Sequence, residues 1–419
     1  MKAIRSFFIV SELFFPLVSW VFIYVVYFSF TWFFKEPLNP AVYLLTIGFL
    51  ACLYMGYYLN GGYLKYDASK AIKKKLNLLI PALIGFSSVV LYFLANLANL
   101  HKDVATIRDE RFESNTGNVF YDTLYIFLFP LFYISFIWVN FNNLKYKRLI
   151  NFLALLTCIA FVPINGGRTN FILFGVLYLG IYMVKNFEKL KKHALKSFLK
   201  FTGMFFLLVV LAVLFSVVRL GSNNDELITN FYRLQFIQNS ALNWLLSIPN
   251  GVGAVLGIFI YTFYDYTGGV IYYLSIFYTN SDKISQRTYG AYNFSVFDRF
   301  VDINWIKTHD SIDNLYLNSD IEYNVWASSF RDLYVDFGFA GGFIFTFIMA
   351  LIMFNARKYL YESYAAQVVF FQLLAYFLFA PFHSMFFISP FYGLTFVVSL
   401  IMFYRYKSTH RKKVSTVGV

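Results

Sequence analysis

The sequence predicts an all-α polytopic membrane protein with about ten transmembrane helices and one large extracytoplasmic loop. Hydrophobic residues make up 59% of the 419 residues and charged residues only 14%, and the mean hydropathy is +0.59. A soluble domain of this size could not bury so much apolar surface, so lipid must cover part of it. The spacing of the apolar segments and the uneven distribution of Lys and Arg support the same fold class.

The apolar segments determine the number of elements. A segment of about 17–25 apolar residues is long enough to cross a bilayer as a helix, and the chain contains ten such segments. Aromatic residues typical of a membrane interface, such as Trp32, Tyr57 and Trp138, lie near the segment ends. In chain order, the expected spans are 12–34, 41–60, 77–98, 119–140, 149–164, 169–185, 201–218, 337–355, 365–383 and 387–404.

Lys and Arg are concentrated on one side of these spans. The loops of that side and the two termini hold 23 Lys and Arg against 3 acidic residues, a net charge of +20, whereas the whole chain carries only +13. Retained Lys and Arg mark the cytoplasmic side, so both termini are expected in the cytoplasm. The segments counted on that side are the N-terminus, 61–76, 141–148, 185–200, 355–364 and the C-terminal tail.

Four parts of the chain follow from this topology. They are an N-terminal bundle of seven spans (1–218), a large periplasmic loop (219–336), three further spans (337–404) and a basic cytoplasmic tail (405–419). An apolar stretch inside the loop, 252–277, is interrupted by Asp265 between two tyrosines. We interpret it as a re-entrant or interface-lying hairpin, because a carboxylate is costly in lipid but tolerated beside a water-filled cavity. Two short spans there would instead bring the count to twelve, with the same orientation.

Several classes of protein lack support in the sequence. Cys52 and Cys158 lie far apart inside apolar spans, which supports neither a disulfide framework nor a zinc site. The five histidines show no HxxH or HExxH spacing, so no metal or other cofactor is expected. No GxxxxGK[ST] loop for ATP hydrolysis occurs. The basic residues lie in short loops between spans, which argues against nucleic-acid binding.

Arginine recurs at the extracytoplasmic ends of spans, as Arg168, Arg219 and Arg331. A planar, permanently charged guanidinium suits phosphate oxygens at a membrane interface. Gly166 and Gly167 precede Arg168 and leave backbone N–H groups open at a helix N-terminus, which favours an anion site. The alternative is that each arginine reaches the lipid headgroups. Positive charge is otherwise sparse on this side, which favours a binding site.

Acidic and histidine side chains near the same boundary are candidates for proton transfer. Asp332 and Asp336 lie one helical turn apart and therefore share a face, where a carboxylate could activate a hydroxyl. The alternative is a favourable interaction of these acids with a helix N-terminus. His309, in a polar stretch of the large loop, is a candidate general base. His383, at an outer turn, could reach the same cavity or serve a structural role.

Glu12 is an acidic residue predicted to lie inside the first span. Ionisable groups within membranes are functional candidates, and Glu12 would matter most if the protein were a transporter. Its position near the cytoplasmic end offers the alternative that it reaches water or pairs with Lys2 or Arg5.

Three stretches carry a resemblance to a known family: 166–170, 289–299 and 329–338. Arg331 and Gly342 also fit a spaced Arg-x10-Gly pattern, whereas the glycine that follows Arg168, Gly180, lies one residue too far. In these features the chain resembles the Wzy-type O-antigen polymerases, also called oligosaccharide repeat-unit polymerases. The resemblance extends over most of the chain as topology.

The resemblance implies a metal-independent glycosyltransferase of the GT-C type in the bacterial inner membrane. It would join oligosaccharide units carried on undecaprenyl diphosphate into O-antigen or capsular-type polysaccharide at the periplasmic face. The arginines, together with Gly167, would bind the departing diphosphate, whose charge grows in the transition state. Asp336 or His309 would take the acceptor proton. Membrane lipid, a chain-length regulator and a flippase are the implied partners.

Two other functions stay open at this point. An O-antigen ligase has a similar architecture but moves the finished chain to the lipid A core. A lipid-linked oligosaccharide flippase, or another transporter, belongs to a different class. Transporters often show two similar halves and polar groups at the bilayer midplane. The halves of this chain differ and its spans hold few ionisable residues, which favours the polymerase.

Overall fold

The computed structural model describes residues 11–29, 37–62, 77–97, 119–165, 169–192, 267–279, 328–388 and 390–417, with isolated positions at 31, 203, 263–264, 281, 287 and 289. Residues 99–118, between the third and fourth predicted spans, lie outside the described residues. So do most of the predicted large loop and, apart from position 203, the seventh predicted span.

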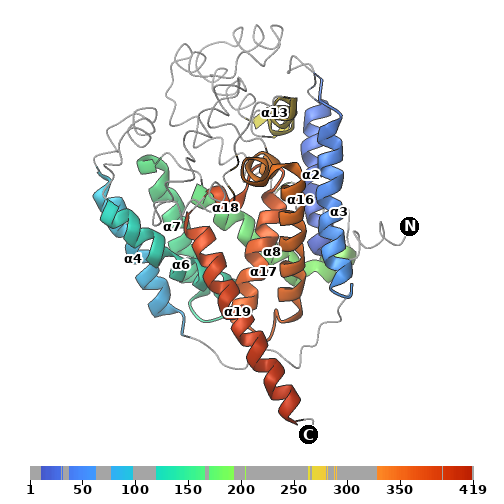
Figure 1. Ribbon diagram of the computed structural model, residues 1–419. Coiled ribbons are helices and arrows are strands. Elements are labelled where there is room, and N and C mark those ends of the chain that lie inside the picture. The colour runs from blue at the N-terminus through green and yellow to red at the C-terminus, as the bar shows by residue number, and fades with distance from the viewer. Residues whose placement is uncertain are drawn as a thin grey trace.

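The described chain is helical and contains no strand (Figure 1). Every predicted span except the seventh overlaps one of its long helices. The helices are α2 (Ser11–Ser29), α3 (Ala41–Leu59), α4 (Leu79–Ala95), α6 (Val119–Asn142), α7 (Lys147–Asn165), α8 (Thr169–Lys192), α13 (Gly268–Thr279), α16 (Ser328–Lys358), α17 (Tyr364–Phe379), α18 (Met385–Ile388) and α19 (Pro390–Val417).

Five of these helices are long and apolar enough to cross a membrane, judged by length and composition. Two shorter apolar helices, α4 and α17, accompany them. The described chain is thus an α-helical membrane protein, while the number of ten spans stays a prediction. The five helical segments are Ser11–Ser29, Ala41–Leu59, Phe120–Asn142, Asn170–Phe187 and Ser328–Lys358.

Helix α17 forms the centre of the bundle. All of its residues from 365 to 379 are buried, and it packs against α2, α6, α8, α16 and α19. The outer helices α3, α4 and α7 instead expose large apolar side chains, among them Leu44, Ile80 and Phe152. An apolar surface of this kind suits a lipid environment rather than water.

Small residues let pairs of helices approach closely. A Cβ at Gly85 of α4 would lie 2.4 Å from the backbone nitrogen of Phe132 in α6, and a Cβ at Gly56 of α3 would lie 2.6 Å from Cβ of Ala350 in α16. Such contacts between glycine and a neighbouring helix are typical of packing within membranes, where dispersion forces replace the hydrophobic effect.

Helix α16 has two parts separated by Gly338. The backbone there has φ 70° and ψ 178°, a conformation that is essentially restricted to glycine. The part after the kink, residues 339–358, is about 30 Å long at 1.5 Å per residue, which matches the thickness of the hydrocarbon core. The first part, residues 328–337, lies at the end of the bundle where α13 is also found (Figure 1).

Helix α13 coincides with the second half of the predicted hairpin at 252–277. Its 12 residues extend about 18 Å, which is too short to cross a bilayer. The helix is almost entirely buried and packs against α2, α3 and α16. Asp265 and, apart from positions 263 and 264, the first half of the hairpin lie outside the described residues.

An ion pair between the buried Glu12 and the partly exposed Arg357 lies at the opposite end of α16. The Nε of Arg357 is 2.8 Å from Oε1 of Glu12, and Ser11 Oγ donates a hydrogen bond to the other carboxylate oxygen. The expected partners of Glu12, Lys2 and Arg5, lie outside the described residues. The ion pair joins the start of α2 to the last turn of α16.

Candidate active site

The first part of α16 is fixed by backbone hydrogen bonds to the turn that follows α17. Ser328 N donates to Phe382 O at 3.0 Å, and Ser329 N donates to Ala380 O at 2.8 Å. Ser328 has a positive φ of 70°, and its Oγ accepts a hydrogen bond from Phe330 N at 3.1 Å. These contacts hold the two residues that follow, Arg331 and Asp332, beside the turn at 380–384.

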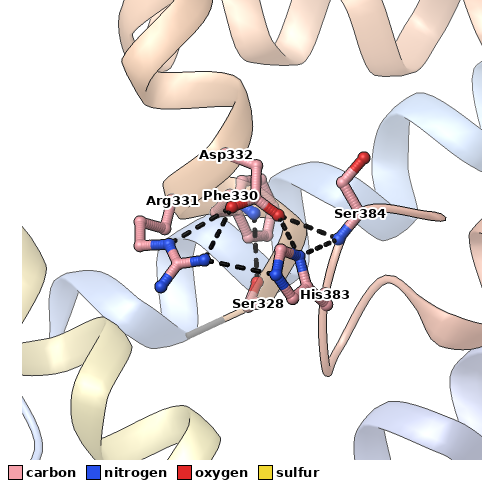
Figure 2. Close-up of polar contacts among 6 residues, drawn as sticks. All are labelled: Ser328, Phe330, Arg331, Asp332, His383 and Ser384. Atoms are coloured by element: carbon pink, nitrogen blue, oxygen red, sulfur yellow. Dashed lines mark hydrogen bonds and ion pairs between the residues drawn. The ribbon is translucent and has the colours of Figure 1, made fainter. Parts of the chain in front are cut away.

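Asp332 is the centre of a buried polar cluster (Figure 2). Its Oδ1 accepts hydrogen bonds from Nε (3.2 Å) and Nη2 (2.9 Å) of Arg331. Its Oδ2 lies 2.5 Å from Nδ1 of His383 and accepts a hydrogen bond from Ser384 N at 2.9 Å. Asp332 is 0% exposed, Arg331 is 1% exposed and His383 is 5% exposed. Both oxygens of a fully buried carboxylate are therefore satisfied, as burial of a charge requires.

The contacts of His383 define its tautomer. A proton on Nδ1 is shared with the Asp332 carboxylate, which leaves Nε2 as the acceptor. Arg331 Nη2 lies 3.4 Å from that Nε2, and a guanidinium can only donate. Ser384 N also lies 2.8 Å from Nδ1, but Nδ1 already carries a proton, so we assign this N–H to the carboxylate. The hydroxyl of Ser384 points away from the cluster (Figure 2).

This arrangement gives His383 the chemistry of a positioned base. A carboxylate bonded to Nδ1 holds the imidazole ring in one orientation and tautomer, so that Nε2 can accept a proton. The contact from Arg331 to Nε2 is at the long end of the hydrogen-bond range and is the weakest in the cluster. A substrate hydroxyl could replace it.

The contacts of Arg331 differ from those expected from the sequence. We expected its guanidinium to bind a diphosphate, whereas Nε and Nη2 both bond to Asp332. Two of its donor nitrogens thus balance the charge of a neighbouring carboxylate. A role for Arg331 in diphosphate binding stays a prediction.

Asp336 is also fully buried on the first part of α16. Its backbone carbonyl accepts a hydrogen bond from Tyr289 N at 3.1 Å, which brings the stretch around 287–289 against this helix. The same stretch places Arg287 over the ring of Tyr334, with Cζ 4.1 Å from the ring centroid. Arg287 was not among the residues expected from the sequence, although it lies two residues before the motif that begins at Tyr289.

The other expected site residues are Gly167, Arg168, Arg219 and His309, and they lie outside the described residues. Asn170, in the same motif as Arg168, is buried at the start of α8 and lies within 3.4 Å of the hydroxyl of Tyr125. Gly180 packs against α17, where a Cβ would lie 3.4 Å from Leu374, and Gly342 packs against Leu333 within α16. Both glycines of the spaced patterns thus serve close packing.

Within the described residues, no group of three or more His, Cys, Asp or Glu could hold a metal ion. Cys52 and Cys158 are both free and buried. No protein-family model matches the chain, and comparisons with curated proteins and with solved structures returned no match either.

Proposed function

We propose that the protein is a membrane glycosyltransferase that polymerises oligosaccharide repeat units carried on undecaprenyl diphosphate. The observation that supports this most is the buried Asp332–His383 pair at the end of the helix bundle where α16 begins, because the pair supplies a base next to the proposed membrane boundary. The resemblance of 329–338 to the Wzy-type polymerases includes Asp332 itself. The periplasmic face of the inner membrane and the cytoplasmic position of both termini are part of the proposal.

In the proposed reaction, a hydroxyl of the incoming unit attacks the anomeric carbon of the growing chain. The new bond joins this oxygen to the anomeric carbon, and the bond from that carbon to the diphosphate oxygen breaks. The hydroxyl proton passes to Nε2 of His383, and Asp332 stabilises the imidazolium that forms. The diphosphate departs on its lipid with the bonding electrons, and nearby arginines stabilise its charge.

His383 thereby replaces Asp336 and His309 as the preferred base. The hydrogen bond from Nδ1 to Asp332 fixes the imidazole of His383 in one orientation, which is the geometry that a general base requires, and His309 lies outside the described residues. The diphosphate leaving group is already present on the lipid-linked substrate, so the proposed chemistry uses neither a nucleotide sugar nor ATP.

The test is reconstitution of the full-length protein in lipid nanodiscs with undecaprenyl-diphosphate-linked oligosaccharide units. A ladder of longer lipid-linked products is expected, and His383→Gln should reduce the rate about 10²- to 10⁴-fold, the usual contribution of a general base. The variant should still insert and remain monodisperse. Absence of a ladder with the wild-type protein, while labelled substrate crosses a liposome membrane, would reject the polymerase in favour of a transporter.

A genetic test separates polymerase from ligase. Deletion of a polymerase gene should remove long surface chains and retain single attached units. Loss of the single units together with the long chains would indicate a ligase instead.

A further inference from the structure

Arg287 has an unusual environment for a charged side chain. Its guanidinium lies over the ring of Tyr334, with Cζ 4.1 Å from the centroid. Its Nη1 is buried and has no hydrogen-bond partner. In the part of the chain that the structure describes, this cation–π contact is the only interaction found for the Arg287 guanidinium.

The surroundings hold Arg287 in this place. Tyr334 donates a hydrogen bond from its hydroxyl to Ser281 O at 2.6 Å, and its ring packs against Phe339, with the centroids 4.3 Å apart. Tyr289 N bonds to the carbonyl of Asp336 at 3.1 Å. The platform under the guanidinium is therefore fixed on two sides, and Arg287 does not need its own hydrogen bonds to stay there.

The kink at Gly338 adjoins the same guanidinium. A Cβ at Gly338 would lie 3.5 Å from Nε of Arg287 and 3.9 Å from its Nη2. Arg331 and Tyr334 are three residues apart and lie on neighbouring positions of one helix face. Arg287 therefore approaches the same part of α16 that carries the Asp332 cluster.

The two arginines differ in what their donors do. Arg331 uses Nε and Nη2 on Asp332, so its charge is balanced within the protein. Arg287 has no carboxylate partner among the described residues, and a buried guanidinium donor without an acceptor is unfavourable. An aromatic face compensates only part of this cost, because a cation–π contact leaves the N–H groups in the plane of the guanidinium without acceptors. An anion with several oxygens would satisfy them.

We propose that Arg287 binds a phosphate group of the lipid diphosphate, while Arg331 holds Asp332 and His383 in position. This inference rests on the proposed function, and it names a binding residue that differs from the three arginines expected from the sequence. The guanidinium would donate through its planar N–H groups to two phosphate oxygens, with the ring of Tyr334 behind it.

The experiment measures binding of undecaprenyl diphosphate to the full-length protein in phosphatidylcholine nanodiscs by native mass spectrometry. Arg287→Gln should weaken binding about 10- to 100-fold, which is the loss of a charge-assisted hydrogen-bond pair. The affinity of Arg287→Lys should lie between those of the wild type and Arg287→Gln, because lysine keeps the charge and loses the planar pair of N–H donors. The matched control is Arg148→Gln, an exposed arginine at the start of α7, which should bind as the wild type does.

A second measurement needs no variant. Phenylglyoxal modifies accessible arginines, and undecaprenyl diphosphate should protect Arg287 in the wild-type protein, as detected by peptide mass spectrometry. Unchanged binding in Arg287→Gln overturns the inference. If that variant does not fold, unprotected modification of Arg287 overturns it. Protection by phosphatidylglycerol equal to that by the diphosphate lipid would also overturn it, because the site would then be a headgroup contact.

The outcomes separate the inference from the proposed function. Binding that depends on Arg287, without chain growth from lipid-linked units, supports the inference and rejects the polymerase. Chain growth with unchanged binding and KM in Arg287→Gln supports the polymerase and rejects the inference.

Discussion

Replacing Asp332 by Asn tests the buried cluster most directly. The carboxylate accepts from Nε and Nη2 of Arg331 through one oxygen, and from Nδ1 of His383 and Ser384 N through the other. An amide keeps the shape but removes the charge and turns one acceptor into a donor. Arg331, only 1% exposed, would then be a buried cation without its counter-charge. Breaking a buried ion pair from one side costs about 3–5 kcal/mol.

The expected result is a lower thermal midpoint and loss of polymer. The drop in midpoint should be roughly 3–6 °C for a chain of this length, measured by fluorescence-detected size-exclusion chromatography of detergent-solubilised protein. Arg148→Gln, at an exposed arginine at the start of α7, is the control and should change the midpoint little. A double variant with Arg331→Gln should lose less than the sum of the two single variants, because neither charge is then stranded. Strictly additive losses, or a midpoint equal to that of the control, would refute the reasoning.

Three further substitutions have defined outcomes. Gly338→Ala should cost about 1–3 kcal/mol and reduce chain growth, because alanine is strained in the backbone conformation of this kink. The added Cβ would meet Arg287 only at van der Waals distance, so a clash does not contribute. A normal melting curve would contradict this prediction. Gly85→Ala should lower the free energy of unfolding by about 1–3 kcal/mol, because its Cβ would overlap the backbone of Phe132. The control is Gly203→Ala, where the added Cβ would meet open space. Glu12→Gln should cost about 1.5–3 kcal/mol by weakening the hydrogen bond from Arg357, and unchanged polymer length is expected; loss of polymer at normal stability would instead favour a transport role.

The helices were predictable because hydropathy reports a local property. Each expected span needed only a window of about 20 residues with few charges, and the boundaries of α3 and α17 agree with their spans to within a few residues. The start of α16 was not predictable in this way. Residues 328–336 include an arginine and two aspartates, so we assigned them to the large loop, yet they are buried. Arg331 and Asp332 balance each other's charge, and Asp332 is also bonded to His383 and Ser384, more than 50 residues away in the sequence.

The site was predictable only in part for the same reason. Arg331, Asp332 and Asp336 were candidates because their residue types and spacing suit phosphate binding and proton transfer. The partner of Asp332 was not evident, because His383 lies 51 residues further on and meets it only through the turn after α17. The local partners considered for Glu12 reflect the same limit, since Arg357 approaches it from the far end of α16. Arg287 was missed because its environment depends on Tyr334.

The attachment of α16 to the turn after α17 has a consequence for how the sequence can vary. Ser328 and Ser329 are joined to Phe382 and Ala380 through main-chain N–H and C=O groups, which every residue except proline supplies in full. Side chains at 329, 380 and 382 can therefore change while the aspartate still faces the imidazole, whereas position 328 has a positive φ and uses its hydroxyl to accept a hydrogen bond from Phe330 N. A chain built in this way can diverge widely in composition and keep its reacting groups aligned, provided that proline does not enter at 328 or 329.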